Sequence, residues 1–321
     1  MNIANANLQL LDPRFSQPET LVFVVGTQKG GTTWLYKYLH AHPEVCMPDW
    51  KEHNFWNTVE GQTDSGSALM RLKARREKQW RLISVLRDMG FSDAARRRRG
   101  ARRALAAAEA PMRPYRAYAD SLFANFGPDH KAVGEVSPAY EELSAETYRE
   151  MASLAPNVKF IFLMRDPVSR LISGVLHGLR ATTKVTELTE GMLHDALLSE
   201  LDQGLQGRTA LRRSRYDLTI ADLEAAVPAS QIGYYFFESL FEQSEIDKLC
   251  DFIGIGHYDA ELKKAQNVGS GKSVAIAPAD RARIALMLAP AYVSLRQKFG
   301  DAIPPAWQKS EALLNGTAGG V

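Results

Sequence analysis

Four short apolar runs stand out along the chain, and each is continuous rather than alternating between apolar and polar residues. Strands that are buried on both faces of a parallel sheet have this pattern. The runs predict strands at Leu21–Gly26, Ala132–Val136, Lys159–Met164 and Ile232–Phe237.

A helical pattern follows each predicted strand. The pattern covers Thr32–His40, Ser144–Leu154, Val168–Leu179 and Ser239–Ile253, and a last helix covers 278–299 and ends at Gly300. Serine is a preferred N-cap residue, and proline is a preferred first-turn residue such as Pro167. Strands that alternate with helices predict βαβ units, and therefore an α/β fold in which helices flank a parallel sheet.

Residues 64–120 interrupt this alternation with a segment rich in Arg, Lys, Ala and Leu, including four consecutive arginines at 96–99. We expect a helical insertion within a single domain that spans residues 1–321. Insertions at the carboxyl ends of strands usually form lids or walls of a ligand site. The arginines indicate either a solvated helix face or a surface for an anionic acceptor or a membrane.

The composition excludes several classes of protein. The chain has 321 residues, 45% of them apolar, and a net charge of +2, which gives no global sign of nucleic-acid binding. Its two cysteines, Cys46 and Cys250, lie far apart, which argues against a zinc site and a disulfide framework. No signal-peptide pattern is evident, and the apolar runs are far shorter than the roughly 20 residues that span a bilayer. We therefore predict a soluble, cytoplasmic protein.

The turn after the first predicted strand has the chemistry of a phosphate cradle. Its sequence is GTQKGGTTW at residues 26–34. Glycines let consecutive N–H groups face one anion, and the N-terminus of the next helix adds partial positive charge. Lys29 adds a full charge, and Thr32 and Thr33 add hydroxyl donors. Lys29 precedes the glycines, whereas nucleotide triphosphatases have a lysine after the last glycine and then a hydroxyl that holds magnesium.

A second candidate anion site follows the third predicted strand. Arg165 ends this strand, and Ser173 lies two turns along the next helix. An arginine fork with a serine hydroxyl suits a phosphate monoester. Both positions can face the crevice above the sheet where ligands of open α/β folds bind. Two such sites fit a nucleotide with phosphates at both its 5′ and 3′ ends. We expect Asp166 to cap the helix and Arg170 to pair with a structural carboxylate.

These two motifs resemble those of the sulfotransferases that use 3′-phosphoadenosine 5′-phosphosulfate (PAPS). The resemblance implies that the 5′-phosphosulfate is held by Lys29, Gly30, Gly31, Thr32 and Thr33. Trp34 matches the tryptophan that stacks on adenine. Arg165 and Ser173 match the pair that binds the 3′-phosphate. Lys272, in a polar loop at 267–273, matches the family's late basic loop, which closes over that phosphate.

Sulfuryl transfer is an in-line displacement in which positioning and charge stabilisation supply most of the rate. Lys29 and the loop amides can stabilise the leaving group, so we expect no metal ion. A general base must also take the proton of the acceptor. The segment KEHNFW at residues 51–56 resembles an element of the heparan-type branch, whose glutamate base matches Glu52. His53 is the competing base, because the small-molecule branch uses a histidine.

The acceptor stays open among small molecules, carbohydrates and lipids, and no nucleic-acid partner is expected. Val136 follows Glu135 where heparan-directed enzymes often have a lysine, which argues against a heparan-like acceptor. Two other functions compete with sulfuryl transfer. A P-loop kinase or NTPase would need a magnesium-binding hydroxyl after a lysine and an acidic residue on a second strand. A catalytically inactive nucleotide-binding module remains an alternative, because fold alone does not imply activity.

Overall fold

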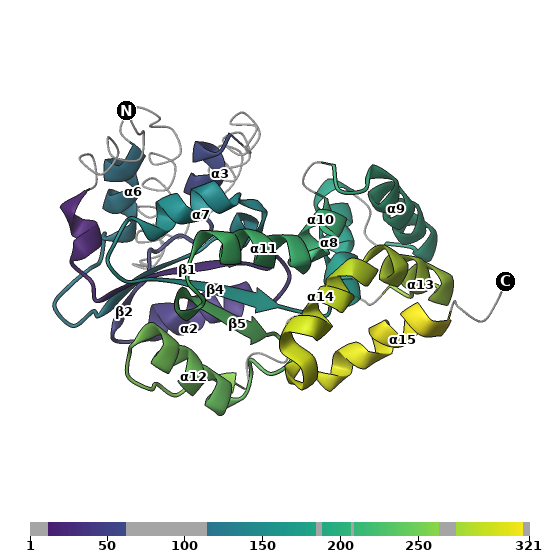
Figure 1. The fold of residues 1–321 in the computed structure, drawn as a ribbon. Coiled ribbons are helices and arrows are strands. Elements are labelled where there is room, and N and C mark those ends of the chain that lie inside the picture. The colour runs from purple at the N-terminus through teal and green to yellow at the C-terminus, as the bar shows by residue number, and fades with distance from the viewer. Residues whose placement is uncertain (1–11, 62–113, 184–187, 207–208, 263–273, 317–321) are drawn as a thin grey trace, which may run out of the picture.

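The computed structural model describes residues 12–61, 114–183, 188–206, 209–262 and 274–316. At its centre lies a five-stranded sheet, in which all pairings are parallel and the strand order is β2-β3-β1-β4-β5 (Figure 1). The strands are β1 (Thr20–Gly26), β2 (Val45–Cys46), β3 (Ala132–Val136), β4 (Val158–Met164) and β5 (Ile232–Phe236). The predicted α/β fold with a parallel sheet is confirmed.

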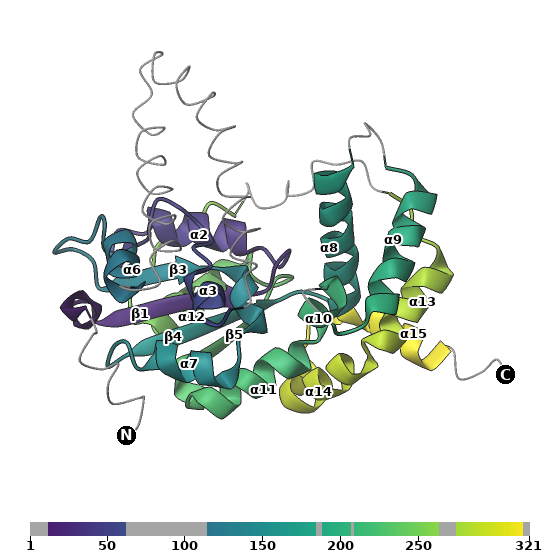
Figure 2. The ribbon, with the colours of Figure 1, turned by 90° about the horizontal axis from the view of Figure 1, so that it is seen from above.

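Helices cover both faces of this sheet (Figures 1 and 2). One face carries α2 (Thr32–Ala41) and α12 (Gln243–Ile253), and the other carries α7 (Ala145–Ala152) and α11 (Tyr216–Ala226). Strand β1 shows why its sequence is continuously apolar. Successive side chains of a strand point to opposite faces. Phe23 therefore packs into the core cluster on the α7 side, whereas Val22 and Val24 pack into the cluster on the α2 side.

Further helices lie beyond the carboxyl edge of the sheet, where α8 begins directly after β4 (Figure 2). They are α8 (Pro167–Thr182), α9 (Glu190–Gln203), α10 (Ala210–Ser214), α13 (Pro278–Met287), α14 (Ala289–Phe299) and α15 (Gln308–Gly316). Among the described residues, two more helices lie between β2 and β3 in the chain. The short α3 (Phe55–Val59) follows β2, and α6 (Pro114–Leu122) precedes β3.

Two predicted helices differ from the observed ones. The helix predicted at Ser239–Ile253 begins only at Gln243, because Ser239 lies in a turn in which its hydroxyl donates to the Phe236 carbonyl at 3.3 Å. The helix predicted at 278–299 is two helices, α13 and α14. The chain leaves helical geometry at Leu288, just before the first turn of α14, which contains a proline. Proline has no backbone N–H to continue a helix from the preceding turn.

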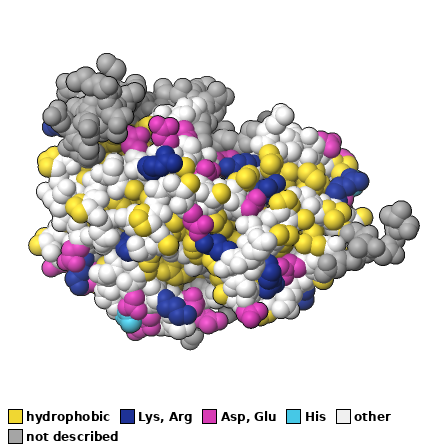
Figure 3. Space-filling view, in the orientation of Figure 1, with side chains coloured by type: hydrophobic (Ala, Val, Ile, Leu, Met, Phe, Trp, Pro, Cys, Tyr) yellow, Lys and Arg dark blue, Asp and Glu magenta, His cyan; other side chains and the backbone are white. Residues whose placement is uncertain are grey.

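The other predicted strands and helices match the observed elements within a few residues at each end, and Gly300 ends α14 as expected. The two-residue strand β2 was not predicted. Most of the predicted insertion at 64–120 lies outside the described residues, as does Lys272. No helix among the described residues is both long and apolar enough to cross a bilayer. On the face shown in Figure 3, basic and acidic side chains are interspersed.

Candidate functional site

The loop between β1 and α2 is packed so tightly that its glycines have no room for a side chain. A Cβ on Gly30 would lie 2.5 Å from the Thr27 side chain, and one on Gly31 would lie 2.7 Å from the Phe237 ring. Gly31 also has a φ of 94°, which side chains rarely tolerate. Lys29 has a φ of 72°. The backbone of the loop is therefore tightly curled, with a positive φ at both Lys29 and Gly31.

Lys29 and Arg165, which are distant in sequence, meet at the carboxyl edge of the sheet. The Arg165 Nη1 donates to the Lys29 carbonyl at 3.3 Å, and the guanidinium lies 5.1 Å from the Phe237 ring centroid. The Tyr216 hydroxyl fixes Arg165 by donating to its carbonyl at 2.9 Å. Burial, followed by the charge of Arg165 and other nearby cations, lowers the pKa of Lys29. Lys29 and Arg165 thus lie together in one region of the structure, with other cations nearby.

The other predicted donor residues lie along α2 and α8. Thr32 is buried, Thr33 is exposed, and Ser173 is half-buried on α8. The half-buried Trp34 stacks on Tyr38 with a centroid distance of 5.9 Å, and its ring meets the edge of Phe241 at 5.2 Å. The Trp34 indole thus lies in an aromatic group near the start of α2.

Lys51 and Glu52 lie beside the same loop. The Lys51 Nζ donates to the Glu52 carboxylate at 2.6 Å and lies 3.4 Å from the Thr32 hydroxyl. The Glu52 side chain is 44% exposed. Its φ of 67° is uncommon for a residue with a side chain, and its N–H donates to the Val136 carbonyl at 3.0 Å. No role was predicted for Lys51, since a lysine beside a glutamate is ordinary until the fold brings it to Thr32.

His53 points in the opposite direction from its neighbour, into the interior. Its side chain is fully buried, and its Nε2 lies 2.5 Å from the Ser121 hydroxyl. Its Nδ1 lies 3.8 Å from the Glu135 carboxylate. Burial lowers the pKa of His53, and the charge of Glu135 opposes this effect. His53 is therefore an interior side chain.

Glu135, near the end of β3, is only 1% exposed. Its carboxylate accepts hydrogen bonds from the hydroxyls of Tyr118, Ser137 and Tyr140. The Ser137 hydroxyl in turn accepts from the Asn54 N–H at 3.4 Å. Glu135 thus anchors the segment that carries Glu52 instead of presenting its own carboxylate to a ligand.

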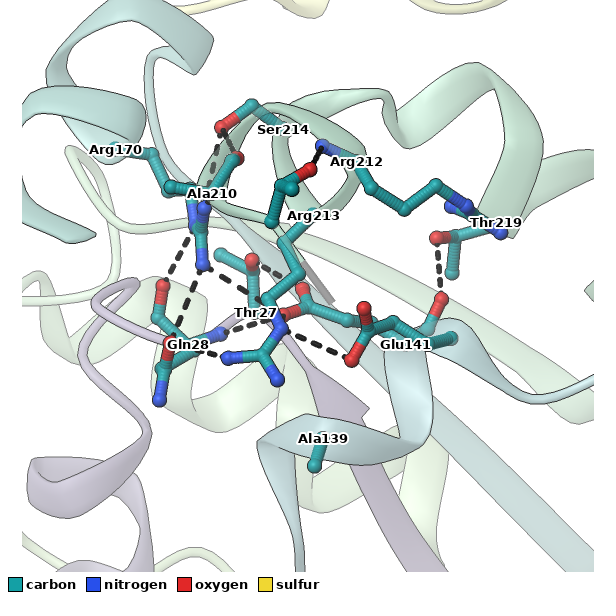
Figure 4. A network of polar contacts seen from close by, with 12 residues as sticks. Thr27, Gln28, Ala139, Glu141, Arg170, Ala210, Arg212, Arg213, Ser214 and Thr219 are labelled. Atoms are coloured by element: carbon teal, nitrogen blue, oxygen red, sulfur yellow. Dashed lines mark hydrogen bonds and ion pairs between the residues drawn. The ribbon is translucent and has the colours of Figure 1, made fainter. Parts of the chain in front are cut away.

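A second buried carboxylate, Glu141, lies under the loop (Figure 4). It accepts from the Thr27 hydroxyl, and from the Gln28 N–H at 3.3 Å. Arg170 donates to the Gln28 carbonyl at 2.9 Å and lies 3.9 Å from Glu141, which confirms that it pairs with a structural carboxylate. Arg213 donates to the Gln28 side-chain oxygen at 2.6 Å. Burial raises the pKa of Glu141 to about 7, while Arg170 and Arg213 oppose the rise.

Three further polar side chains near the site are Asp166, Tyr216 and His177. Asp166 caps α8, as predicted, by accepting from the Ser169 N–H at 2.9 Å. Tyr216 is fully buried, and His177 is exposed on α8. Within the described residues, no group of three or more His, Cys, Asp or Glu side chains is arranged to hold a metal ion. Glu141 and Arg213 had no signal in the sequence, because each reaches the loop from a separate element.

Solved structures with similar folds are sulfotransferases. The sulfotransferase from Alicyclobacillus acidocaldarius is 20% identical, and the superposition has a TM-score of 0.60 and covers 91% of this chain and 99% of that one. The sulfotransferase domain of the Synechococcus PCC 7002 olefin synthase is 18% identical, with a TM-score of 0.45 and coverage of 95% and 97%. At 20% identity, the likeness to the first of these structures concerns the fold alone.

A search of curated proteins finds no match. A family model described as "Sulfotransferase family" matches residues 22–259, which include the loop after β1, the Lys51–Glu52 pair and Arg165. The chain therefore belongs to the sulfotransferase family, an enzyme family whose members take a sulfuryl group from PAPS.

Proposed function

We propose that this protein transfers a sulfuryl group from PAPS to a hydroxyl or amine of a small-molecule, carbohydrate or lipid acceptor. The observation that carries the proposal is the contact between Arg165 and the backbone of Lys29. Strand β1 lies between β3 and β4 in the sheet, so the strands that follow it in the chain lie on opposite sides of it. Ligands of open α/β sheets bind at such a switch point, beyond the carboxyl ends of the strands.

The donor-binding residues are proposed as the sequence predicted them. Lys29, Gly30, Gly31, Thr32 and Thr33 hold the 5′-phosphosulfate at the N-terminus of α2. The tight glycine packing supports this role, because the backbone itself must approach the ligand. Trp34 stacks on adenine, and Arg165 and Ser173 bind the 3′-phosphate. Lys272 is proposed to join them, although it lies outside the described residues.

In the proposed reaction, the acceptor oxygen or nitrogen bonds to sulfur while the bond from sulfur to the bridging phosphate oxygen breaks. Lys29 stabilises the negative charge that grows on the leaving phosphate. Lys51 adds a second ammonium group, 3.4 Å from the Thr32 hydroxyl. These fixed cations supply the charge stabilisation that magnesium supplies in NTPases, so we propose that transfer needs no metal ion.

Glu52 is proposed as the general base that takes the acceptor's proton. Its carboxylate is partly exposed and lies beside Lys51 at the edge of the donor loop. The competing base, His53, is fully buried and contacts Ser121 and Glu135. A group that exchanges protons with a substrate must be able to reach it, which favours Glu52.

The proposed location is the cytoplasm, and both cysteines, Cys46 and Cys250, are buried free thiols. No nucleic-acid partner is proposed. The mixed charges in Figure 3 support this view for the face shown there, because nucleic-acid surfaces are usually uniformly basic. A membrane surface remains a proposed partner only through the arginines at 96–99, which lie outside the described residues.

The test is thermal stabilisation by nucleotides, because a ligand that binds the native state raises its melting temperature. We expect 3′-phosphoadenosine 5′-phosphate, the desulfated donor, to raise the melting temperature in the presence of EDTA. ATP with magnesium should raise it much less at the same concentration. A preference for ATP, or equal shifts, would overturn the proposed donor. A shift that appears only when a metal is added would overturn the metal-free mechanism.

A further inference from the structure

Glu141, Arg170 and Arg213 form a buried group under the donor loop, and none of them has a role in the chemistry proposed so far. We propose that Glu141, Arg170 and Arg213 are positioning residues, which hold Thr27 and Gln28 so that the loop presents its donors to the nucleotide. This inference rests on the proposed function of the loop. The three side chains come from three elements, namely the 3₁₀ turn η3 (Pro138–Glu142), α8, and α10, and they converge on the start of the loop (Figure 4).

The first argument concerns the carbonyl groups of the loop. A carbonyl oxygen that faced the ligand would repel an anion. The Gln28 carbonyl is instead held by Arg170 at 2.9 Å, and the next carbonyl, that of Lys29, is held by Arg165 at 3.3 Å. Two consecutive carbonyls are thus bound to guanidinium groups. Because Arg170 is fully buried, it holds the negative end of the Gln28 peptide group toward the interior.

The second argument concerns the backbone conformation. Lys29 has a φ of 72°, in a region that residues with side chains rarely occupy. Such a conformation persists only where its surroundings enforce it. The residue before Lys29 is fixed at three atoms, because Glu141 accepts from the Gln28 N–H, Arg170 binds the Gln28 carbonyl, and Arg213 binds the Gln28 side chain. The buried group supplies the enforcement.

The third argument concerns charge. Glu141 is fully buried, and a buried carboxylate is retained only when it is paired and hydrogen-bonded. Arg170 lies 3.9 Å and Arg213 lies 4.0 Å from its oxygen, and Arg213 also pairs with Glu142 at 2.9 Å. Two acidic side chains, Glu141 and Glu142, therefore lie beside two guanidinium groups beneath the loop. The group can hold the loop without opposing the positive charge that Lys29 and Arg165 present above it.

The first test compares two arginines that lie two residues apart. The Arg213 side chain is 13% exposed and pairs with Glu142, whereas the Arg215 side chain is 16% exposed and pairs with Asp217 at 2.7 Å. Only Arg213 contacts the donor loop. We expect Arg213→Met to weaken binding of 3′-phosphoadenosine 5′-phosphate about tenfold, the usual effect of losing one charged hydrogen bond. Arg215→Met should leave that affinity within about twofold.

The second test compares two buried threonines at opposite ends of β1. The Thr20 hydroxyl donates to the Ile253 carbonyl at 2.8 Å, whereas the Thr27 hydroxyl donates to Glu141. Both Thr→Val variants should lower the melting temperature. Only Thr27→Val should also weaken nucleotide binding, and Thr27→Ser, which keeps the hydroxyl, should restore it. If Thr27→Val does not fold, the Arg213 and Arg215 pair still decides the matter.

The outcomes separate the two proposals. If the unaltered protein does not bind 3′-phosphoadenosine 5′-phosphate, the proposed function fails. If it binds, but Arg213→Met and Thr27→Val bind as tightly as their control variants, the positioning role is overturned and the group serves stability alone. If each member of a pair weakens binding equally, the effect reflects general destabilisation, and the positioning role is again overturned.

Discussion

Two buried glutamates, six residues apart in sequence, support different halves of the site. Glu135 at the end of β3 accepts only from the neutral hydroxyls of Tyr118, Ser137 and Tyr140. Glu141 also accepts hydrogen bonds from a hydroxyl and a backbone amide of the donor loop. In addition, the guanidinium groups of Arg170 and Arg213 lie within 4.0 Å of its carboxylate. The first carboxylate anchors the segment that carries Glu52. The second anchors the loop that carries Lys29.

The difference follows from what each half must bind. The donor is an anion, so its loop needs cations, and the cations near the loop need a buried counter-charge. In the proposed mechanism, residues 51–56, here called the base segment, present the Glu52 carboxylate to an acceptor, and Lys51 already pairs with that carboxylate at 2.6 Å. Hydroxyl donors satisfy Glu135 without adding charge. Changes in the base segment should therefore affect transfer, and changes around the donor loop should affect nucleotide affinity.

The largest expected effect is on the base segment. Glu52→Gln should reduce transfer by about 10²–10⁴-fold, the usual contribution of a general base. Affinity for 3′-phosphoadenosine 5′-phosphate should stay nearly unchanged, because the variant keeps the donor loop intact. The measurements are single-turnover transfer with saturating donor, and calorimetric binding of the product nucleotide.

The matched control for this variant is Glu44→Gln. Glu44 pairs with Lys131 at 2.7 Å, as Glu52 pairs with Lys51, but it lies next to β2 at the amino end of the sheet. It should keep normal transfer. Near-normal turnover of Glu52→Gln, combined with loss of turnover in His53→Gln at unchanged melting temperature, would exchange the roles of these two residues.

A smaller effect is expected in the donor half. Arg165→Ala should weaken binding of 3′-phosphoadenosine 5′-phosphate about 10–100-fold, since a hydrogen-bonded charge pair is lost. The loss for adenosine 5′-phosphate should be smaller, because that nucleotide lacks the 3′-phosphate. Titration calorimetry with both nucleotides measures the difference. Equal losses would mean that Arg165 acts only through the Lys29 carbonyl, to which it donates at 3.3 Å.

The sequence predicted the sheet, and it predicted that Lys29 and Arg165 each lie at the carboxyl end of a strand, for related reasons. Continuous apolar runs identify strands buried on both faces, and parallel strands place their carboxyl ends at one edge. Lys29 and Arg165 each follow such a strand directly. Their meeting is therefore a consequence of topology. Ser144 and Asp166 were predictable as helix caps, because capping is a local interaction.

The supports of the site could not be predicted in the same way. Glu141, Arg170 and Arg213 come together only through the packing of η3, α8 and α10, and no periodic pattern encodes these contacts. The orientations of Glu52 and His53 were also open, because adjacent residues in an irregular segment have no fixed faces. The backbone at Glu52, with a φ of 67°, sets these orientations.

The smallest expected effect concerns pH, and it tests the donor half of the site, which contains Lys29 and Arg165. The folded protein lowers the pKa of Lys29 below its ordinary value of 10.5, chiefly through burial and then through Arg165. Lys29 therefore loses its charge at a lower pH than an exposed lysine would. Affinity for 3′-phosphoadenosine 5′-phosphate should fall as pH rises past this lowered pKa, by at most about tenfold per pH unit.

Lys29→Arg keeps the charge and should move this alkaline limit upward, whereas Lys37→Arg, at an exposed position of α2, should not. An alkaline limit that is unchanged in Lys29→Arg would assign the titration to another cation and contradict the place of Lys29 beside the anion.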